Sequence, residues 1–339
     1  MTAGSAARIY RGTTHNLRRL AGALRRGELV AAPTETVYGL AADATNAAAC
    51  RAIFRAKRRP ATDPLIVHVH DLAQLGQVAE INDAARAVAR RFWPGPLTLI
   101  LPKRPAVPAV VTSGGTSVAV RMPAHPLFRR LLRLTGRPLA APSANPFGYV
   151  SPTTAEHVRA GLGRRIRHIL DGGPSPIGVE STILDLRDAK RPTILRPGAV
   201  GAAELAAVLG RPVREVRRVT APTDAAPAPG LLARHYSPTT PIKLYRGKPP
   251  RAAAGEARVF FEPPQAALET NDFVLTRDGS GEAAARRLFA LLRELDDGRW
   301  QRLHIQLAPA HRALAPAIND RLRRAAATSE APAEARRQR

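Results

Sequence analysis

The sequence has few sulfur-containing and few aromatic residues. Its 339 residues include one cysteine and two methionines, and aromatic residues make up 4%. A single cysteine excludes a disulfide within the chain and any zinc site built on several cysteines. Because Cys50 falls on the face of a predicted helix, we expect a buried structural thiol. The few aromatic rings disfavour a surface that reads RNA bases by stacking.

Long apolar runs and the common nucleotide-binding motifs are also missing. No run approaches the roughly 18 apolar residues of a membrane span, and the first thirty residues lack a secretory signal. We therefore expect a cytoplasmic protein without membrane contact. The chain has no G-x-x-x-x-G-K-[ST] loop, no G-x-G-x-x-G after a strand and no H-E-x-x-H motif. Any ATP is held by another arrangement, and we predict that any metal arrives with the nucleotide.

Acidic residues are scarce. Aspartate and glutamate number 27 against 52 lysines and arginines, which gives a net charge of +25. Such an excess is typical of proteins that contact phosphates, because cations displace counterions from nucleic acids. Only five of the 52 basic residues are lysine, however, and GC-rich codon usage also favours arginine, alanine and proline. The net charge alone therefore does not decide whether the protein contacts tRNA.

The length and the hydrophobic periodicity predict two α/β domains. A chain of 339 residues exceeds what one core usually supports. We assign residues 1–210 to a first domain in which helical and strand patterns alternate. We expect helices at 17–24, 47–58, 84–92, 127–134, 155–162 and 202–209, and strands at 29–33, 65–69, 97–101, 117–121, 139–142, 166–170, 182–186 and 193–195.

The C-terminal third contains a connector and a smaller domain. Residues 211–241 form a predicted linker, because periodicity disappears in a stretch rich in alanine and proline. Residues 242–327 alternate short strands and helices, which predicts a small α/β domain with mostly parallel strands. We expect strands at 242–245, 259–261, 273–275 and 303–307, helices at 283–295 and 312–324, and a disordered tail at 328–339.

Polar clusters follow several of the predicted strands and helices. Residues 33–40 read Pro-Thr-Glu-Thr-Val-Tyr-Gly-Leu, which places two hydroxyls and a carboxylate at the end of a strand. Lys57 and Arg59 follow a helix. Cations are favoured at that position by the helix dipole, but a point charge and a planar fork are also suited to neighbouring phosphates.

Three further clusters have similar character. Ser143 and Asn145 follow the strand at 139–142, and Ser151 precedes a helix N-terminus, which favours anions. Residues 178–182 read Gly-Val-Glu-Ser-Thr, and residues 195–198 read Leu-Arg-Pro-Gly. Each cluster by itself is compatible with an ordinary capped loop.

Taken together, these motifs resemble the YrdC-like family. The resemblance is carried by residues 33–40, Lys57-x-Arg59, Ser143-x-Asn145, residues 178–182 and residues 195–198, in this order. Pro-Gly at 229–230, followed by His-Tyr-Ser-Pro at 235–238, resembles the linker of the two-domain form. The resemblance implies a twisted mixed sheet with a concave cavity, followed by a small Rossmann-like α/β domain.

The resemblance also implies a reaction. Family members of this form join L-threonine, bicarbonate and ATP into threonylcarbamoyl-AMP and pyrophosphate, for the threonylcarbamoyladenosine that lies next to the tRNA anticodon. It implies Mg²⁺ with the ATP and a tRNA-modifying transferase complex as the acceptor of the product. By similarity, threonine is bound by Thr36, His68, Arg121, Ala141 and Ser181. By similarity, ATP is bound by Lys57, Arg59, Asp63, Thr112, Ser143, Asn145, Ser151, Arg196, His235 and Tyr236.

Roles within these two sets follow from charge. We expect Lys57 and Arg59 to be the catalytic cations on the phosphates, and Arg121 to bind the threonine carboxylate. Asp63 stands where relatives often carry asparagine. A carboxylate is unfavourable beside a triphosphate unless it faces a ribose, an amide or a magnesium ion.

The predicted linker contains a second feature. Arg234, His235 and Tyr236 place a cation, an imidazole and an aromatic ring in a short segment before Pro238. This composition predicts a lid that shields the adenylate from water. In the alternative interpretation, Tyr236 packs on the second domain.

Two other functions remain as alternatives. An RNA-binding protein without catalysis explains the charge but leaves Thr36, Ser143 and Ser181 unexplained. Another enzyme that forms a carbamoyl-adenylate, as in hydrogenase maturation factors, explains those residues. Such factors carry acylphosphatase and zinc-finger regions, and this chain lacks both.

Overall fold

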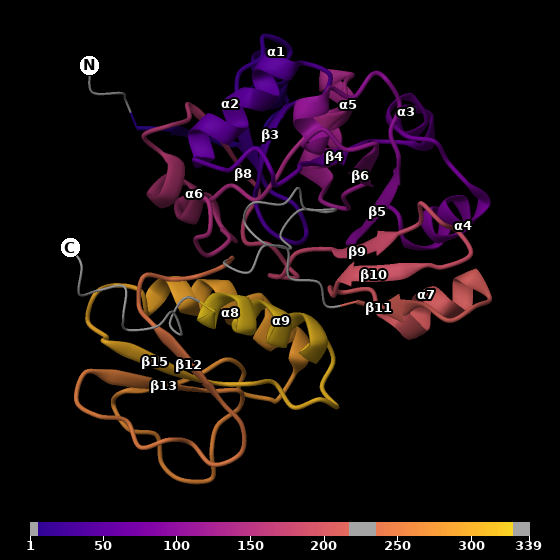
Figure 1. Ribbon diagram of the computed structural model, residues 1–339. Helices are drawn as coiled ribbons and strands as arrows, with labels where there is room; N and C mark the ends of the chain where they lie inside the picture. The colour runs from indigo at the N-terminus through magenta and orange to yellow at the C-terminus, as the bar shows by residue number, and fades with distance from the viewer. Residues whose placement is uncertain (1–5, 217–234, 328–339) are drawn as a thin grey trace, which may run out of the picture. The chain divides into compact units, whose positions relative to one another are not determined.

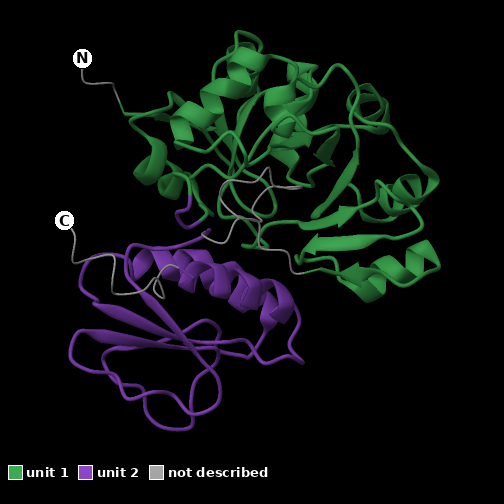
Figure 2. Ribbon diagram, viewed as in Figure 1, with its two compact units in different colours: residues 1–147, 151–232 green, residues 148–150, 233–339 purple. Residues whose placement is uncertain are grey.

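The structure is a computed structural model that describes residues 6–216 and 235–327. It divides into two compact units (Figure 2). Unit 1 comprises Met1–Phe147 and Ser151–Leu232, and unit 2 comprises Gly148–Val150 and Ala233–Arg339. The predicted linker is described only at 211–216 and 235–241, and the predicted tail lies outside the described residues. Within the described part, no helix has the length and apolar character needed to cross a membrane.

Unit 1 is built on a mixed sheet of eleven strands in the order β1-β8-β2-β3-β7-β4-β6-β5-β9-β10-β11. Parallel and antiparallel pairs alternate irregularly across it. This confirms the predicted α/β class with a mixed sheet. The strands are β1 (Arg8–Arg11), β2 (Val30–Ala32), β3 (Gly39–Asp43), β4 (Ile66–His68), β5 (Leu97–Pro102), β6 (Ser117–Arg121), β7 (Leu139–Ala140), β8 (His168–Asp171), β9 (Thr182–Asp185), β10 (Thr193–Arg196) and β11 (Arg214–Glu215).

Helices cover both faces of this sheet (Figure 1). Val30 packs in a cluster with α1 and α5, whereas its neighbour Ala31 packs in a larger cluster with α2, α4, α6 and α7. Successive strand residues point to opposite faces, so the two clusters are the two sides of the sheet. The helices are α1 (Thr14–Arg25), α2 (Ala47–Lys57), α3 (Leu72–Val78), α4 (Asp83–Phe92), η1 (Ala109–Thr112), α5 (Pro126–Thr135), α6 (Ala155–Leu162) and α7 (Ala202–Leu209).

Most predicted elements are present, and their ends differ by a few residues at most. Strand β3 was not predicted: it begins at Gly39, inside the 33–40 motif, and pairs antiparallel with β2. Its sequence, Gly-Leu-Ala-Ala-Asp, contains no β-branched residue, so local propensity gives no strand signal. Residues 214–215, in the predicted linker, add a short strand beside β10.

Unit 2 is a parallel four-stranded sheet in the order β12-β15-β13-β14. The strands are β12 (Ile242–Tyr245), β13 (Glu256–Phe260), β14 (Asp272–Val274) and β15 (Arg302–Gln306), and the helices are α8 (Gly281–Glu294) and α9 (Ala315–Ala326). The two helices contact each other (Figure 1). The parallel strands confirm the predicted small α/β domain.

Candidate functional site

A row of residues with four polar side chains, His68, Arg121, Thr98 and Arg196, crosses the sheet of unit 1. His68 on β4 lies opposite Arg121 on β6, and Arg121 lies opposite Thr98 on β5. Thr98 is paired with Ile183 on β9, and Ile183 with Arg196 on β10. Side chains directly opposite each other share one face of a sheet, so this row lies on a single face. The next residues on that face are apolar and include Ile66, Ile100 and Ala119.

Arg121 contacts three other residues through its guanidinium group. Its Nη1 donates to Thr36 Oγ1 at 2.9 Å, its Nε donates to the Gly95 carbonyl at 3.2 Å, and its Nη2 pairs with Glu35 at 2.6 Å. Arg121 and Glu35 are both buried. The structure thus brings together Arg121 and Thr36, two of the predicted threonine-binding residues, and joins them to a carboxylate that the sequence analysis did not assign.

His68 is a buried, uncharged side chain next to Arg121. Its ring packs edge-on against Phe128 of α5 at 5.3 Å between centroids. Burial is the main cause and the positive charge of Arg121 is the second, and together they lower the pKa of His68 to about 3. The imidazole is therefore neutral at physiological pH.

Ser181 connects two strands of the row. Its Oγ lies 2.7 Å from Thr98 Oγ1, and Arg196 donates to the Ser181 carbonyl at 3.1 Å and to its Oγ at 3.2 Å. Gly198 permits this approach, because a Cβ there would lie 2.2 Å from the backbone nitrogen of Thr182. A side chain at position 198 would therefore force Arg196 away from Ser181.

Lys57 lies at the end of α2 and is buried. Its Nζ donates to the carbonyls of Ser143 and Asn145, each at 2.5 Å. Burial holds the pKa of Lys57 well below its usual range, and the neighbouring charge of Arg59 acts in the same direction. Arg58, in the left-handed conformation with φ 53°, ends the helix and turns the chain. Lys57 thus fixes the loop that carries two other predicted ATP-binding residues.

Arg59 and Asp63 form a second buried ion pair. The Nη2 of Arg59 lies 2.8 Å from Asp63 Oδ2, and both side chains are almost fully inaccessible to solvent. Arg59 also donates to the Asp63 carbonyl at 2.8 Å and to the Pro64 carbonyl at 2.7 Å. The carboxylate at position 63 therefore faces a cation of its own chain, which explains how it is tolerated there.

The remaining predicted residues of unit 1 are held by hydrogen bonds to other residues of the same unit. Ser151 Oγ donates to Glu180 at 2.6 Å, Thr112 Oγ1 donates to the Gly115 carbonyl at 2.9 Å, and the Ala141 amide donates to the Ile66 carbonyl at 2.9 Å. Ser143 forms an isolated bridge with Gly39 at the start of β3, which places the 143–145 loop beside the 33–40 motif.

His235 and Tyr236 belong to unit 2. The Tyr236 ring stacks on Phe289 of α8 at 5.4 Å, and the Arg321 guanidinium lies 5.5 Å from its centroid. The His235 ring meets the Tyr236 ring edge-on at 4.2 Å. Tyr236 thus makes the packing contacts of the alternative interpretation. Its predicted contact with ATP stays a prediction, and Arg234 lies outside the described residues.

Cys50 is confirmed as a buried free thiol, and its Sγ donates to the Asp43 carbonyl at 3.3 Å. Three residues of the site were missed: Glu35, Thr98 and Glu180. Thr98 carries a usable signal, because it is the polar residue in the otherwise apolar strand Leu-Thr-Leu-Ile-Leu. Glu35 and Glu180 lie inside the quoted motifs, but their partners are far away in the sequence.

No group of three or more histidine, cysteine, aspartate or glutamate side chains is arranged to hold a metal within the described part of the chain. Two carboxylates near the site, Glu35 and Asp63, are engaged by Arg121 and Arg59. These residues do not form a magnesium site by themselves.

Comparison with known families covers nearly the whole chain. Residues 22–198 match a family that comprises Sua5, YciO and YrdC and is described as telomere recombination. Residues 200–327 match the C-terminal domain of threonylcarbamoyl-AMP synthase.

Individual relatives agree with these matches. The threonylcarbamoyl-AMP synthase of Pyrococcus abyssi is 48% identical over 236 residues, which is 68% of either chain. That of Bacillus subtilis is 41% identical over 292 residues, or 82% of this chain and 84% of the relative. Among solved structures, Pyrococcus abyssi Sua5 complexed with L-threonine has a TM-score of 0.86 at 38% identity, over 96% of this chain and 98% of that one. Escherichia coli YciO has a TM-score of 0.53 at 20% identity, over 59% of this chain and 99% of that one, and it shares the fold.

Proposed function

Because this chain belongs to the threonylcarbamoyl-AMP synthase family, we propose that it joins L-threonine, bicarbonate and ATP into threonylcarbamoyl-AMP with release of pyrophosphate. The chain is an enzyme, a transferase that forms an adenylate, and it serves the threonylcarbamoyladenosine modification of tRNA. One observation carries the proposal for the site. Arg121, Thr36 and Glu35 are joined in a buried cluster on the same sheet face as His68 and Thr98.

L-threonine fits the chemistry of this cluster. Arg121 would bind its carboxylate, because the guanidinium already holds a carboxylate of the chain in a short ion pair. The hydroxyls of Thr36 and Ser181 would bind the threonine hydroxyl. His68 stays neutral, so it lines the site without repelling the substrate amine. A water-poor site also lowers the pKa of the amine, which must be uncharged to react.

ATP would be held by the cations of the neighbouring loops. Arg59 and Arg196 carry the planar guanidinium groups that match phosphate oxygens, and both are buried. Lys57 contributes by holding the Ser143 and Asn145 loop in place. Adenylate formation would depend mainly on positioning the substrates and on neutralising phosphate charge. The folded protein holds the groups that do this in place before the substrates react.

The reaction needs no covalent intermediate on the enzyme. The neutral threonine amine attacks carbon dioxide supplied by bicarbonate, which forms the N–C bond of a carbamate and releases one proton to solvent. A carbamate oxygen then attacks the α-phosphorus of ATP. The bond from the α-phosphorus to the bridging oxygen breaks, and its electron pair leaves with pyrophosphate. Arg59 and Arg196 stabilise the charge that gathers on the phosphate oxygens.

Magnesium would enter with the triphosphate. The described residues offer no cluster of metal ligands, so the phosphates themselves are its expected ligands. When bound, Mg²⁺ would neutralise phosphate charge. We further propose that the product passes to a tRNA-modifying transferase complex, and that the enzyme acts in the cytoplasm.

An assay of pyrophosphate release tests this function. Release from ATP is expected to require both L-threonine and bicarbonate. L-valine, which replaces the hydroxyl by a methyl group, is expected to react with a kcat/KM lower by at least about a hundredfold, because it leaves the site hydroxyls unpaired. Release without threonine, or equal rates with both amino acids, would contradict the proposal.

A further inference from the structure

The hydroxyl of Thr98 is buried and has a single partner. Its Oγ1 lies 2.7 Å from Ser181 Oγ, and the residue is fully buried. Within residues 6–216 and 235–327, Thr98 Oγ1 has no other hydrogen-bond partner. A buried hydroxyl that keeps its proton unpaired loses a hydrogen bond that water would have supplied. Thr98 therefore donates to Ser181, because the reverse bond would leave the Thr98 proton without an acceptor.

The direction of this bond determines what Ser181 can do. A serine hydroxyl has two lone pairs and one proton. Thr98 occupies one lone pair of Ser181 Oγ, and Arg196 Nη2, which donates to the same atom at 3.2 Å, occupies the other. The Ser181 proton then has no acceptor in the described part of the chain, although the residue is buried. Towards a ligand, Ser181 can therefore only donate.

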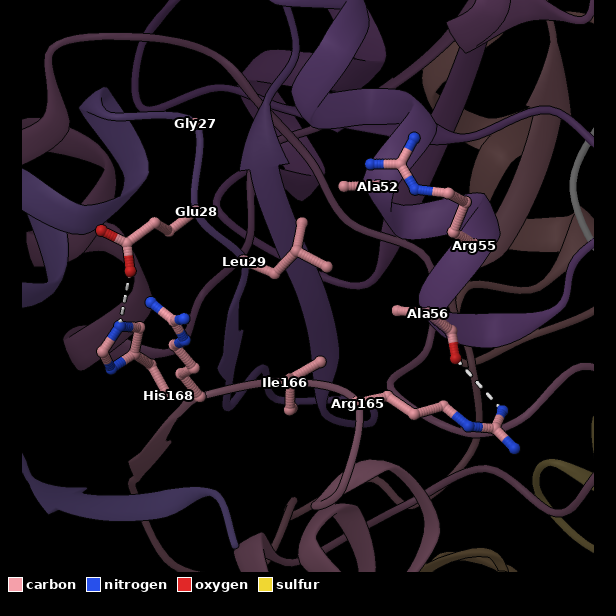
Figure 3. Close-up of a pocket in the computed structure, with 10 residues that line it drawn as sticks. Gly27, Glu28, Leu29, Ala52, Arg55, Ala56, Arg165, Ile166 and His168 are labelled. Carbon is pink, nitrogen blue, oxygen red and sulfur yellow. Dashed lines mark hydrogen bonds and ion pairs between the residues drawn. The ribbon is translucent and has the colours of Figure 1, made fainter. Parts of the chain in front are cut away.

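Polar groups elsewhere in unit 1 are satisfied in other ways. Figure 3 shows a hollow of about 590 Å³ in which Arg55 is exposed, so water can accept from its guanidinium. In the same hollow, His168 and Glu28 pair with each other at 3.0 Å. Neither solution is open to Ser181, which is buried and whose neighbours have no lone pair directed at its proton. A bound substrate can supply the acceptor.

Thr36 has the opposite character. Thr34 Oγ1 lies 2.6 Å from the Val37 carbonyl oxygen, and only the Thr34 proton can bridge this contact, because a carbonyl does not donate. The bond of 2.9 Å between the Thr34 and Thr36 hydroxyls therefore uses the proton of Thr36. Arg121 Nη1 donates to Thr36 Oγ1 at 2.9 Å, which leaves one lone pair. Towards a ligand, Thr36 can therefore only accept.

The donor and the acceptor lie close together in the fold. Thr36 is bonded to Arg121 on β6. Ser181 is bonded to Thr98 on β5, and Thr98 pairs with Arg121 across the sheet. The Gly178 amide also donates to the Thr36 carbonyl at 3.2 Å, which brings the two segments side by side. One donor and one acceptor together are complementary to a hydroxyl group, which can accept one hydrogen bond and donate another.

We propose that Thr98 is a positioning residue that directs the Ser181 proton towards the side-chain hydroxyl of the amino-acid substrate. The substrate hydroxyl accepts from Ser181 and donates to Thr36. An ammonium group could only donate and a methyl group could do neither, so a hydroxyl is the group that satisfies both residues. The inference rests on the proposed function, because it assigns how the threonine site selects its substrate. Thr98 acts through Ser181 and does not itself touch the substrate.

The test measures discrimination against L-α-aminobutyrate, which is L-threonine with the hydroxyl replaced by hydrogen. The ratio of kcat/KM for the two amino acids is measured by pyrophosphate release, with both substrates on one preparation of the full chain, so that the fraction of folded enzyme cancels. Thr98→Val keeps the shape of the side chain but cannot donate, and Thr98→Ser keeps the hydroxyl. Thr135→Val is the matched control, because Thr135 is also buried and its hydroxyl donates to the Leu131 carbonyl of α5 at 2.8 Å.

Thr98→Val is expected to lower the ratio about fivefold or more, because Ser181 loses the bond that orients its proton. Thr98→Ala should do the same, which provides a second variant without the donor. Thr98→Ser and Thr135→Val should keep the wild-type ratio. In a Ser181→Ala background, Thr98→Val should have no further effect on the ratio, because the residue that it positions is already missing its hydroxyl.

An unchanged ratio in Thr98→Val would overturn this role of Thr98, since a merely structural defect lowers the rates with both amino acids alike. An equal fall of the ratio with and without the Ser181 hydroxyl would also overturn it. These outcomes differ from a failure of the proposed function, in which the wild-type protein itself shows no preference for L-threonine. That result would overturn the proposed function and this inference together.

Discussion

Arg121 and Glu35 form an ion pair of 2.6 Å in which both side chains are almost inaccessible to solvent. Withdrawing two charges from water is costly, and a buried pair is therefore a weak source of stability by itself. The pair keeps a guanidinium ready in a dry site. A substrate carboxylate can then engage a cation whose desolvation has already occurred in the folded protein.

The substitution Glu35→Gln should leave Arg121 without a counter-charge. We expect the free energy of unfolding to fall by roughly 3 kcal/mol. L-threonine should recover part of this loss, because its carboxylate takes the place of Glu35, so the ligand should raise Tm more in the variant than in the wild type.

Thermal unfolding with and without L-threonine measures this effect, and L-threoninol, which lacks the carboxylate, is the matched control ligand. Equal shifts of Tm with threonine and threoninol would show that Arg121 does not bind the carboxylate.

The pair Arg59–Asp63 gives a second prediction. Asp63→Asn keeps a hydrogen-bond acceptor beside Arg59 but removes the charge that neutralises it. We expect KM for ATP to fall several-fold with kcat maintained, because the freed guanidinium attracts phosphates more strongly. Steady-state kinetics with varied ATP measure it, and Asp83→Asn on the exposed start of α4 is the control. An unchanged or higher KM would argue against a phosphate contact of Arg59.

The sequence predicts best those elements whose first and last residues are marked by capping residues of the same segment. Helix α6 begins and ends where it was predicted, because Thr154 caps its first turn by accepting from the His157 amide and Gly163 ends it. Strand β3 was missed, because glycine and alanine have no strand preference of their own. Its position depends on pairing with β2 and β7, which only the folded sheet supplies.

The sequence likewise predicted some features of the candidate site and missed others. The polar residues after an apolar strand pointed to Thr36, whereas His68 and Arg121 were candidates through the family resemblance. The register of β4 and β6 brings His68 and Arg121 together. The contacts of Lys57 were not predictable, since its partners are backbone carbonyls 86 and 88 residues away. Which groups a side chain meets across a sheet depends on strand order, and local sequence does not encode strand order.

The pKa of His68 predicts an acid-sensitive fold. Its pKa is about 3 in the folded protein, against 6.5 for an ordinary histidine. Between these values the unfolded chain binds a proton that the folded chain excludes, so stability is lost as pH falls below about 6.5 and is constant above it. The loss should approach about 1.4 kcal/mol per pH unit.

Urea unfolding from about pH 7 down to about pH 4.5 checks this slope. His68→Gln should reduce the slope, whereas His15→Gln, at an exposed histidine of α1, should not. Parallel curves for His68→Gln and the wild type would mean that His68 is protonated in the folded state.

The last prediction separates the two interpretations of Tyr236. Its side chain is fully buried, stacked on Phe289 at 5.4 Å and covered by the Arg321 guanidinium at 5.5 Å. Tyr236→Ala should therefore destabilise unit 2 by about 3 to 5 kcal/mol, because it leaves a cavity beside α8. Tyr236→Phe keeps the ring and should cost less than about 1.5 kcal/mol.

Hydrogen exchange of the α8 amides measures the destabilisation of unit 2. The ratio of pyrophosphate to threonylcarbamoyl-AMP measures whether the segment acts as a lid that protects the adenylate. If packing is the role of Tyr236, α8 exchanges faster in Tyr236→Ala, whereas Tyr236→Phe keeps wild-type exchange and a product ratio near one. If Tyr236 is part of a lid, the opposite result is expected. Tyr236→Ala would then fold normally but lose adenylate to hydrolysis by water. A Tyr236→Ala protein with wild-type exchange in α8 and a ratio well above one would therefore establish the lid and refute the packing role.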